Sequence, residues 1–304
     1  MRNSGGKSSR RKPADSPMRR NQRLVLTIVS ALAVLMVVLA GVWVGFRFRS
    51  RFVPSQLPTA AKVKPEEHVR IASKVKSPSE DEAIGLVVKA LESPDEMTVA
   101  SRMRLLDASA ADAIRFLKES KSHEIDRKRM QWIGSLDIEG LLIEGVQIQS
   151  AREQDEMGRT AFLVPDEQGN WKLDFDSFAR ICKPDWKTVL DGPPTPAMVR
   201  VLATPDVYYN GQFADESQWR CFGITSPDCY EHLPEEKRLM YAYCRKNSAQ
   251  SRALGRVLSS ESRIFRLTLE IKRAGEGEKL QFEILRVLSE DWVMTDKPFD
   301  ERFQ

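Results

Sequence analysis

The stretch "GNWKLDFDSF", residues 169–178, decides how the middle of the chain is read. Apolar and polar residues alternate, which predicts a β-strand with a different set of side chains on each face. We expect the apolar face to pack against helices and the two acids, Asp174 and Asp176, to face water. Asp176 also stands where the following "SFARIC" segment needs an N-cap. The apolar face carries Trp171, Leu173 and Phe175. No Lys, His or Tyr nearby marks a catalytic partner, so a structural role is predicted for both acids.

Upstream of this strand, apolar residues recur at the spacing of a helix face. "SEDEAIGLVVKALES" (79–93) offers Ser79 as N-cap with Glu82 three residues on, the pattern of a capping box. "SPDEMTVASRMRLL" (93–106) follows a Ser-Pro start, and "SAADAIRFLKES" (109–120) is capped by Ser109. Three short helices are therefore predicted between residues 80 and 120.

After Trp132 the period changes to about two, which indicates strands. "SLDIEGLLIEGVQIQS" (135–150) is interpreted as one strand with a bulge near Gly140. "RTAFLVPD" (159–166) and the opening strand are separated by a Gly-containing turn, typical of a hairpin. Helices followed by strands predict an α+β domain over residues 80–192.

This arrangement resembles a known family. A helix with "VVKALESPDEM", a short helical segment, long strands and then "WKLDFDSFA" before a further Trp are similar to uncharacterised, membrane-anchored bacterial proteins. Their central domain has the nuclear-transport-factor-like cone fold, so the resemblance implies a curved sheet wrapped around helices. Enzymes with this fold, such as steroid isomerases, use an acid with a Tyr or His inside the cone. Residues 80–190 contain no Tyr and a single His, His123, so isomerase chemistry is not expected.

Residues 197–304 have a different pattern. Three strand-like segments, a helical "SAQSRALGRVL" (248–258) and two more strands follow one another, the order found in the oligonucleotide/oligosaccharide-binding (OB) barrel. A small β-rich, OB-like domain is predicted, and the packing of 80–192 and 197–304 into one α+β unit stays open as the alternative. Aromatic residues of this region are expected in the core and its hairpins, not in base stacking: Tyr208, Tyr209, Phe213, Trp219 and Phe222.

The N-terminal region predicts a membrane anchor. Residues 24–46 are uncharged, and at about 1.5 Å per residue this length suffices to cross a ~30 Å hydrocarbon core. Residues 1–23 form a basic tail, which predicts a cytoplasmic N-terminus and contact with anionic lipid head groups. Residues 47–79 are rich in Pro and predict an extended linker. A cleaved signal peptide, releasing a soluble exported protein, is the competing hypothesis.

The charge is divided between the two ends of the chain. Residues 1–79 carry 16 Lys and Arg against 3 Asp and Glu, whereas residues 80–304 carry 31 against 40. Binding to a phosphate backbone requires Lys and Arg that nearby acids do not cancel. Nucleic acid is therefore not an expected partner of residues 80–304.

The candidate reactive residues form no familiar motif. The three histidines, His68, His123 and His232, are scattered, and the cysteines lack a C-x-x-C pair, so no metal, cofactor or catalytic site is predicted. Cys221 and Cys244 fall in the second and third predicted strands of the last region and are the candidate disulfide. Free thiols are the alternative, and four cysteines allow three complete pairings.

These observations predict a single-pass protein in the cell membrane, with its N-terminus in the cytoplasm and its α+β and β-rich domains outside. In a double-membrane bacterium that location is the periplasm. The predicted function is non-enzymatic binding or scaffolding through a protein partner that the sequence does not name. A small-ligand-binding or cryptic catalytic cone is the second hypothesis.

Overall fold

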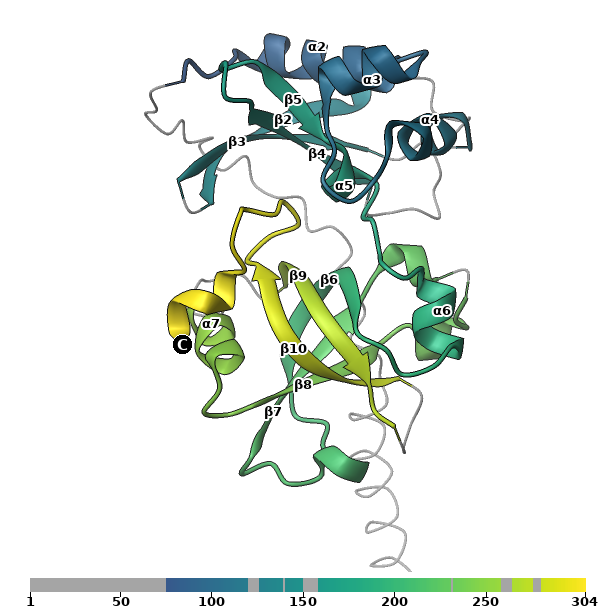
Figure 1. Cartoon of the computed structure of the whole chain (residues 1–304), viewed down its shortest axis with the longest axis vertical. Coiled ribbons are helices and arrows are strands. Elements are labelled where there is room, and N and C mark those ends of the chain that lie inside the picture. Colours follow the sequence, from purple (N-terminus) through teal and green to yellow (C-terminus); the bar gives the residue numbers. More distant parts are fainter. Residues whose placement is uncertain are drawn as a thin grey trace, which may run out of the picture. The chain divides into compact units, whose positions relative to one another are not determined.

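A computed structural model describes residues 75–119, 126–138, 140–149, 158–230, 232–257, 264–275 and 280–304. They form an α+β structure with an open five-stranded sheet and a closed five-stranded barrel (Figure 1). Residues 59–304 belong to one compact unit. Within the described ranges, no helix combines the length and apolar character needed to span a membrane. The predicted tail (1–23), the predicted span (24–46) and the linker up to residue 74 lie outside them.

Three helices are formed before β2, as predicted: α2 (Glu80–Leu91), α3 (Glu96–Arg102) and α4 (Ala110–Glu119). The capping box of α2 is formed, because the Ser79 amide donates to the Glu82 carboxylate at 2.7 Å and the Glu82 amide donates to Ser79 Oγ at 3.3 Å. Ser109 caps α4 by accepting from the Asp112 amide at 3.1 Å. Asp95 caps α3. Local sequence therefore decides where each of these helices begins.

The sheet has the strand order β1-β5-β4-β3-β2, in which only β1 and β5 run parallel. Its strands are β1 (Met103–Arg104), β2 (Met130–Ile138), β3 (Leu141–Ile148), β4 (Arg159–Pro165) and β5 (Trp171–Asp174). The prediction of one bulged strand over 135–150 is wrong. Gly140 adopts φ +86°, a left-handed conformation that suits a tight turn, so the chain reverses there and β2 and β3 pair as a hairpin. The β4–β5 hairpin is confirmed.

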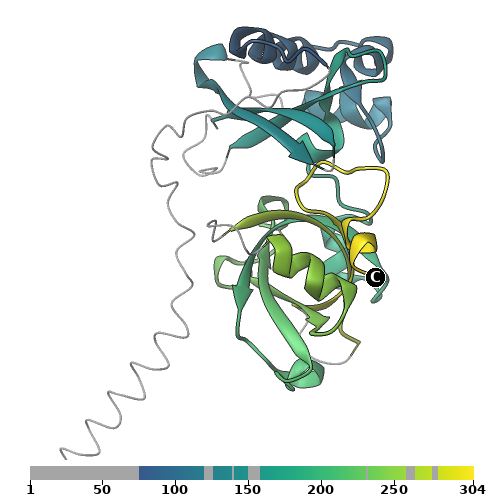
Figure 2. The ribbon, with the colours of Figure 1, turned by 90° about the vertical axis from the view of Figure 1, so that its left-hand side faces the viewer.

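Both faces of the sheet are buried. One face packs on the helices, which Figure 2 shows lying along it, through Val87, Leu163, Leu173 and other apolar side chains. The opposite face carries a smaller apolar cluster of Ile138, Ile143, Phe162 and Val164 with Trp292 and Val293. Trp292 and Val293 follow the last barrel strand in the sequence, so the C-terminal segment covers the face that the alternation assigned to solvent.

The barrel follows two short helices, α5 (Phe175–Phe178) and α6 (Trp186–Asp191). Its strands close in the order β10-β8-β7-β6-β9, with β8 and β10 parallel and the other pairs antiparallel. Helix α7 (Ala249–Val257) connects β8 to β9. The strands are β6 (Ala197–Asp206), β7 (Trp219–Thr225), β8 (Met240–Arg245), β9 (Phe265–Arg273) and β10 (Gln281–Ser289).

Apolar side chains at every second strand position fill the barrel. Phe265, Leu267, Leu269 and Ile271 occupy every second position of β9, and all four belong to the barrel core. Short 3₁₀ helices lie in the connections and at the end of the chain. They are η1 (Arg127–Arg129), η2 (Gly211–Phe213), η3 (Pro227–Cys229), η4 (Glu235–Lys237) and η5 (Phe299–Phe303).

Candidate functional site: buried acids where the sheet meets the barrel

Asp174 ends β5 and is fully buried. One carboxylate oxygen accepts from the Ser177 amide at 2.9 Å, which makes Asp174 the N-cap of α5. The other oxygen lies 2.7 Å from Nη1 of Arg104, the last residue of the parallel edge strand β1. Both oxygens of this carboxylate are thus engaged by the protein itself.

Asp176 is also fully buried, and its carboxylate holds a loop in place. Oδ2 accepts from the Leu106 amide at 2.8 Å, and Oδ1 accepts from the amides of Asp107 and Ala108 at 3.0 and 2.9 Å. Three consecutive main-chain donors converge on one carboxylate, and hydrogen bonds to a charged acceptor are stronger than neutral ones. The connection between β1 and α4 is therefore fixed by Asp176.

The prediction that these acids face water is wrong, and so is the assignment of the cap to Asp176. The physical reason is the second layer over their face of the sheet. Arg104 Nη2 donates to the Met294 carbonyl at 2.9 Å, so the arginine that pairs with Asp174 also binds the C-terminal segment. Alternation within one strand cannot reveal a covering segment more than 100 residues away. The prediction that Phe175 and Leu173 pack with the helices is confirmed.

A buried arginine lies beside the acids. Arg200 on β6 is fully buried, and it donates to the carbonyls of Trp292 at 3.0 Å and Ile181 at 2.8 Å. Burial lowers the pKa of its guanidinium, and the charges of Asp174 and Asp176 oppose that shift. Nη2 of Arg200 has no hydrogen-bond partner among the described residues. The acids therefore provide the counter-charge that a buried guanidinium requires.

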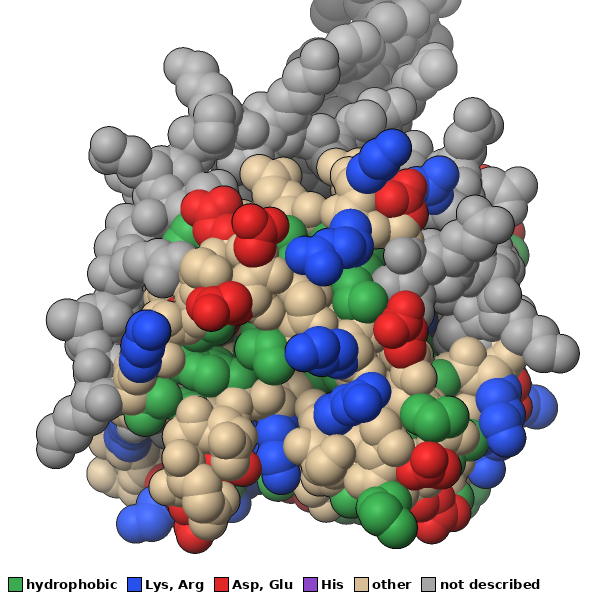
Figure 3. Space-filling model, turned by 90° about the horizontal axis from the view of Figure 1, so that it is seen from above, with side chains coloured by type: hydrophobic (Ala, Val, Ile, Leu, Met, Phe, Trp, Pro, Cys, Tyr) green, Lys and Arg blue, Asp and Glu red, His purple; other side chains and the backbone are tan. Residues whose placement is uncertain are grey.

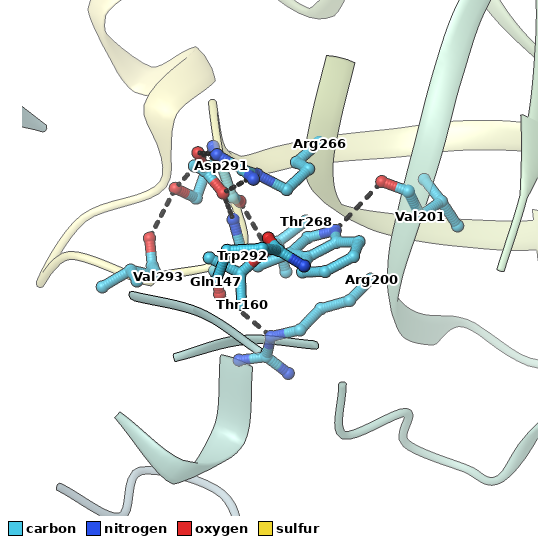
Figure 4. A network of polar contacts seen from close by, with 10 residues as sticks. Gln147, Thr160, Arg200, Val201, Arg266, Thr268, Asp291, Trp292 and Val293 are labelled. Atoms are coloured by element: carbon cyan, nitrogen blue, oxygen red, sulfur yellow. Dashed lines mark hydrogen bonds and ion pairs between the residues drawn. The ribbon is translucent and has the colours of Figure 1, made fainter. Parts of the chain in front are cut away.

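Trp292 joins the sheet to the barrel, as Figure 4 shows. Its indole Nε1 donates to the Val201 carbonyl of β6 at 3.0 Å, while its ring belongs to the apolar cluster on the sheet. The preceding Asp291 pairs with Arg266 at 3.0 Å, and Thr268 Oγ1 donates to the Asp291 carbonyl at 2.9 Å. Hydrogen bonds at Asp291 and Trp292 thereby hold the irregular segment after β10 on the barrel.

A second ion pair joins Arg180 to Asp228 of η3. Arg180 directly follows α5 and its C-cap, and its Nε and Nη2 atoms donate to the two carboxylate oxygens of Asp228 at 2.6 and 3.0 Å. Arg180 has φ 50°, a left-handed conformation that glycine adopts far more readily. This backbone cost is offset by the two-pronged pair and by the Trp292 ring, whose centroid lies 5.9 Å from the guanidinium carbon.

Sequence reasoning missed Glu144, a third buried acid. It is 0% exposed on β3 and accepts from Trp132 Nε1 and Ser135 Oγ, each at 2.8 Å. It shares the helix-covered face with Val146, two residues further along the strand. A signal was present, because the acid stands within the apolar run "LLIEGVQI", but a strand buried on both faces was not anticipated.

All four cysteines are free in this structure, and its strand register does not place Cys221 and Cys244 side by side. Cys221 and Cys244 do lie on paired strands, but Cys221 is opposite Tyr243 and Cys244 is opposite Arg220. Cys244 belongs to the barrel core and Cys221 to an aromatic cluster outside it, so their side chains point to opposite faces of the sheet. A bridge between them would require one strand to shift by a residue.

The barrel aromatics pack as predicted. Phe213 stacks on Tyr243 with ring centroids 4.1 Å apart and contacts Trp219 edge-on at 4.9 Å. Tyr208 stacks on Tyr241 at 4.3 Å. The β6–β7 connection thus covers the outer face of β7 and β8. Phe222 lies in the barrel core.

Metal-binding residues do not come together in the part of the chain that the structure describes, where no group of three or more His, Cys, Asp and Glu side chains could hold an ion. His232 is exposed, as predicted, whereas His68 and His123 lie outside the described ranges. Comparison of the chain with family models, curated proteins and solved structures finds no match. The site must therefore be interpreted from its own geometry.

Proposed function

We propose that this chain is a non-enzymatic binding or scaffolding protein, anchored in the cell membrane by residues 24–46, with residues 80–304 outside the cytoplasm. The observation that carries the proposal is the commitment of Asp174 and Asp176 to the fold. Their oxygens accept from main-chain amides and from Arg104, which leaves neither of these two carboxylates free to act as an acid or base on a substrate. A sheet–barrel junction held by these contacts suits the presentation of a fixed surface to a partner.

We also propose that the barrel is an OB-like domain and that the sheet with its helices is a cone-like domain. The barrel order, with a helix between the third and fourth strands, favours an OB-like domain, and the helices packed on the open sheet favour a cone-like domain of the membrane-anchored bacterial type. In OB domains the second and third strands and the loop before them form the usual ligand face. Here that loop, with Tyr208 and Phe213, packs on the corresponding strands.

Charge supports a partner other than nucleic acid. The acids outnumber the basic residues in 80–304, and Figure 3 shows both signs interspersed on the face seen from above. A polyanion needs a field of one sign. We therefore propose a protein partner for residues 80–304 and anionic lipid head groups as the partner of the basic tail (1–23).

Three experiments test the proposal. A reporter that is active only after export, fused to Gln304, should be active, and the chain should stay with membranes in alkaline carbonate. Crosslinking of the tagged full chain, followed by solubilisation, should then capture one specific protein. An inactive reporter contradicts the orientation, release by carbonate contradicts the anchor, and capture equal to that of the anchor alone (residues 1–79) contradicts the scaffold role.

Glu144 favours a second candidate function, a small-ligand-binding cone. Each oxygen of this buried carboxyl group accepts one hydrogen bond from a neutral donor, and a carboxylate oxygen can accept a second one from a ligand in an apolar site. Native mass spectrometry of the chain purified from membranes should then reveal a co-purifying molecule that Glu144→Gln loses. Identical bare-protein masses for both forms contradict this candidate.

A further inference from the structure

Two cysteines that the sequence did not pair lie in neighbouring parts of the fold. Cys182 follows Arg180 by two residues, and Cys229 directly follows Asp228 in η3. The Arg180–Asp228 pair, with its 2.6 and 3.0 Å hydrogen bonds, therefore ties together the two segments that carry these thiols. One segment connects the sheet to the barrel, and the other follows β7.

Both cysteines belong to the packing around the barrel core. Helix α6, which begins four residues after Cys182, packs against η3. Cys229 is fully buried in the barrel core, and Cys182 is a half-buried residue packed against that core. Each Sγ donates to a main-chain carbonyl at 2.9 Å, Cys182 to Pro184 and Cys229 to Ser226. The electrostatic influence of Cys229 also reaches the Cys182 thiol.

The remaining cysteines do not compete for this pairing. Cys221 points into the aromatic cluster outside the barrel and Cys244 into its core, on opposite faces of the β7–β8 pair. Of the three complete pairings that four thiols allow, two join Cys182 to one of these strand residues. Cys182 and Cys229 lie on segments that an ion pair ties together, and both pack on the barrel core, whereas of the other two only Cys244 does.

We propose that Cys182 and Cys229 form a disulfide when the chain folds in contact with a disulfide donor, linking the sheet–barrel connection to the barrel. The presence of that donor rests on the extracytoplasmic location proposed above, where disulfides persist. The bond replaces the two thiol–carbonyl hydrogen bonds and fastens α6 next to the Arg180–Asp228 pair. The sheet–barrel connection is then held by a covalent bond as well as by an ion pair.

The reaction is thiol–disulfide exchange. The Cys182 thiolate attacks one sulfur of the donor disulfide, forming a mixed disulfide and releasing one donor thiolate. The Cys229 thiolate then attacks the Cys182 sulfur and releases the second donor thiolate. One S–S bond forms in the chain as one breaks in the donor, and the donor leaves as two thiols carrying two electrons and the two protons.

Burial decides when this exchange occurs. Desolvation raises the pKa of Cys229 to about 11, and desolvation, with the nearby charges of Asp185 and Asp228, raises the pKa of Cys182 further. Thiolates are the attacking species, so both residues react slowly once the barrel has closed. The link therefore forms during folding, before these thiols are buried.

The test uses the full chain in two settings. In the first, membranes from cells that export the chain are quenched with acid, denatured and treated with a maleimide, and linked peptides are mapped. Maleimide should label Cys221 and Cys244, and one linked peptide should contain Cys182 and Cys229. Cys182→Ser should expose Cys229 to the maleimide, whereas the control Cys244→Ser should leave the link intact.

In the second setting the purified chain is reduced, unfolded and refolded in detergent with reduced and oxidised glutathione. Recovery of the Cys182–Cys229 peptide there supports the pairing whatever the cellular location. The same peptide in refolded protein but not in membranes contradicts the extracytoplasmic location and leaves the pairing supported. A Cys221–Cys244 peptide, or four free thiols after refolding to the native circular dichroism spectrum, overturns the pairing.

Discussion

Replacing Asp176 with alanine should destabilise the protein far more than loss of a helix cap would. The carboxylate accepts from the amides of residues 106, 107 and 108 at 2.8 to 3.0 Å, in a side chain that is 0% exposed. A buried donor left without an acceptor costs about 1–3 kcal/mol. Water entering the vacated space would recover part of this free energy, so we expect Asp176→Ala to lower the free energy of unfolding by about 3–5 kcal/mol.

The assay is urea denaturation of residues 59–304 followed by tryptophan fluorescence. With a slope of about 3 kcal/mol per molar, the denaturation midpoint of Asp176→Ala should fall by roughly 1–1.7 M. Asp191→Ala is the matched control, because that acid lies on α6 with a 63% exposed side chain and should change stability by under about 0.5 kcal/mol. Asp176→Asn keeps one acceptor oxygen and should fall between the two.

The reasoning fails if Asp176→Ala and Asp191→Ala have the same midpoint, because three amides cannot lose a buried acceptor without cost. It also fails if Asp176→Asn is the least stable of the three variants. That order would mean that the side chain is not an acceptor for the loop.

Four further predictions follow from individual contacts. Arg180→Gly should be more stable than Arg180→Ala by about 1 kcal/mol in the same assay, since both lose the ion pair but glycine relieves the left-handed backbone; equal stability contradicts this. Glu144→Gln should change the free energy of unfolding by under about 1 kcal/mol, whereas Glu144→Leu should cost about 2 kcal/mol or more by removing the carboxylate that accepts from Trp132 Nε1 and Ser135 Oγ. Burial raises the pKa of Cys221 and Cys244 to about 12 from 9.0, so their contribution to stability should be constant below pH 9 and fall as pH rises from 9 to 12, and the fall should be smaller in the double Ala variant. Labelled single-stranded DNA or RNA should not bind residues 80–304 at low salt; tight, salt-sensitive binding contradicts the charge argument.

Features set by nearby residues could be predicted from the sequence. The Ser79–Glu82 capping box, the start of α4 at Ser109 and the five barrel strands with α7 between the third and fourth each depend on short-range patterns. The β4–β5 hairpin belongs with them. Each depends on a period, a cap or a turn glycine that stands in the sequence itself.

Features set by distant segments could not be predicted. Asp174 and Asp176 look solvent-facing in an alternating strand, but Asp174 is buried against Arg104, which also binds the Met294 carbonyl, and Asp176 is buried against the loop of residues 106–108. Gly140 permits either a bulge or a reversal, and the pairing of β2 with β3 decides between them. Cys221 and Cys244 were placed on neighbouring strands, but their faces depend on a register that one residue of slip would invert.

The central claim is that Asp176 belongs to the fold and not to a reaction, and amide hydrogen exchange at residues 106–108 tests it most directly. In the wild-type protein these three amides should exchange as slowly as the core strands β3 and β4, because they are released from the carboxylate only when the junction opens. Asp176→Ala should accelerate their exchange well beyond that of the core while the β3 and β4 amides of the folded variant stay protected. Exchange of the wild-type amides as fast as in an unstructured peptide would contradict the account.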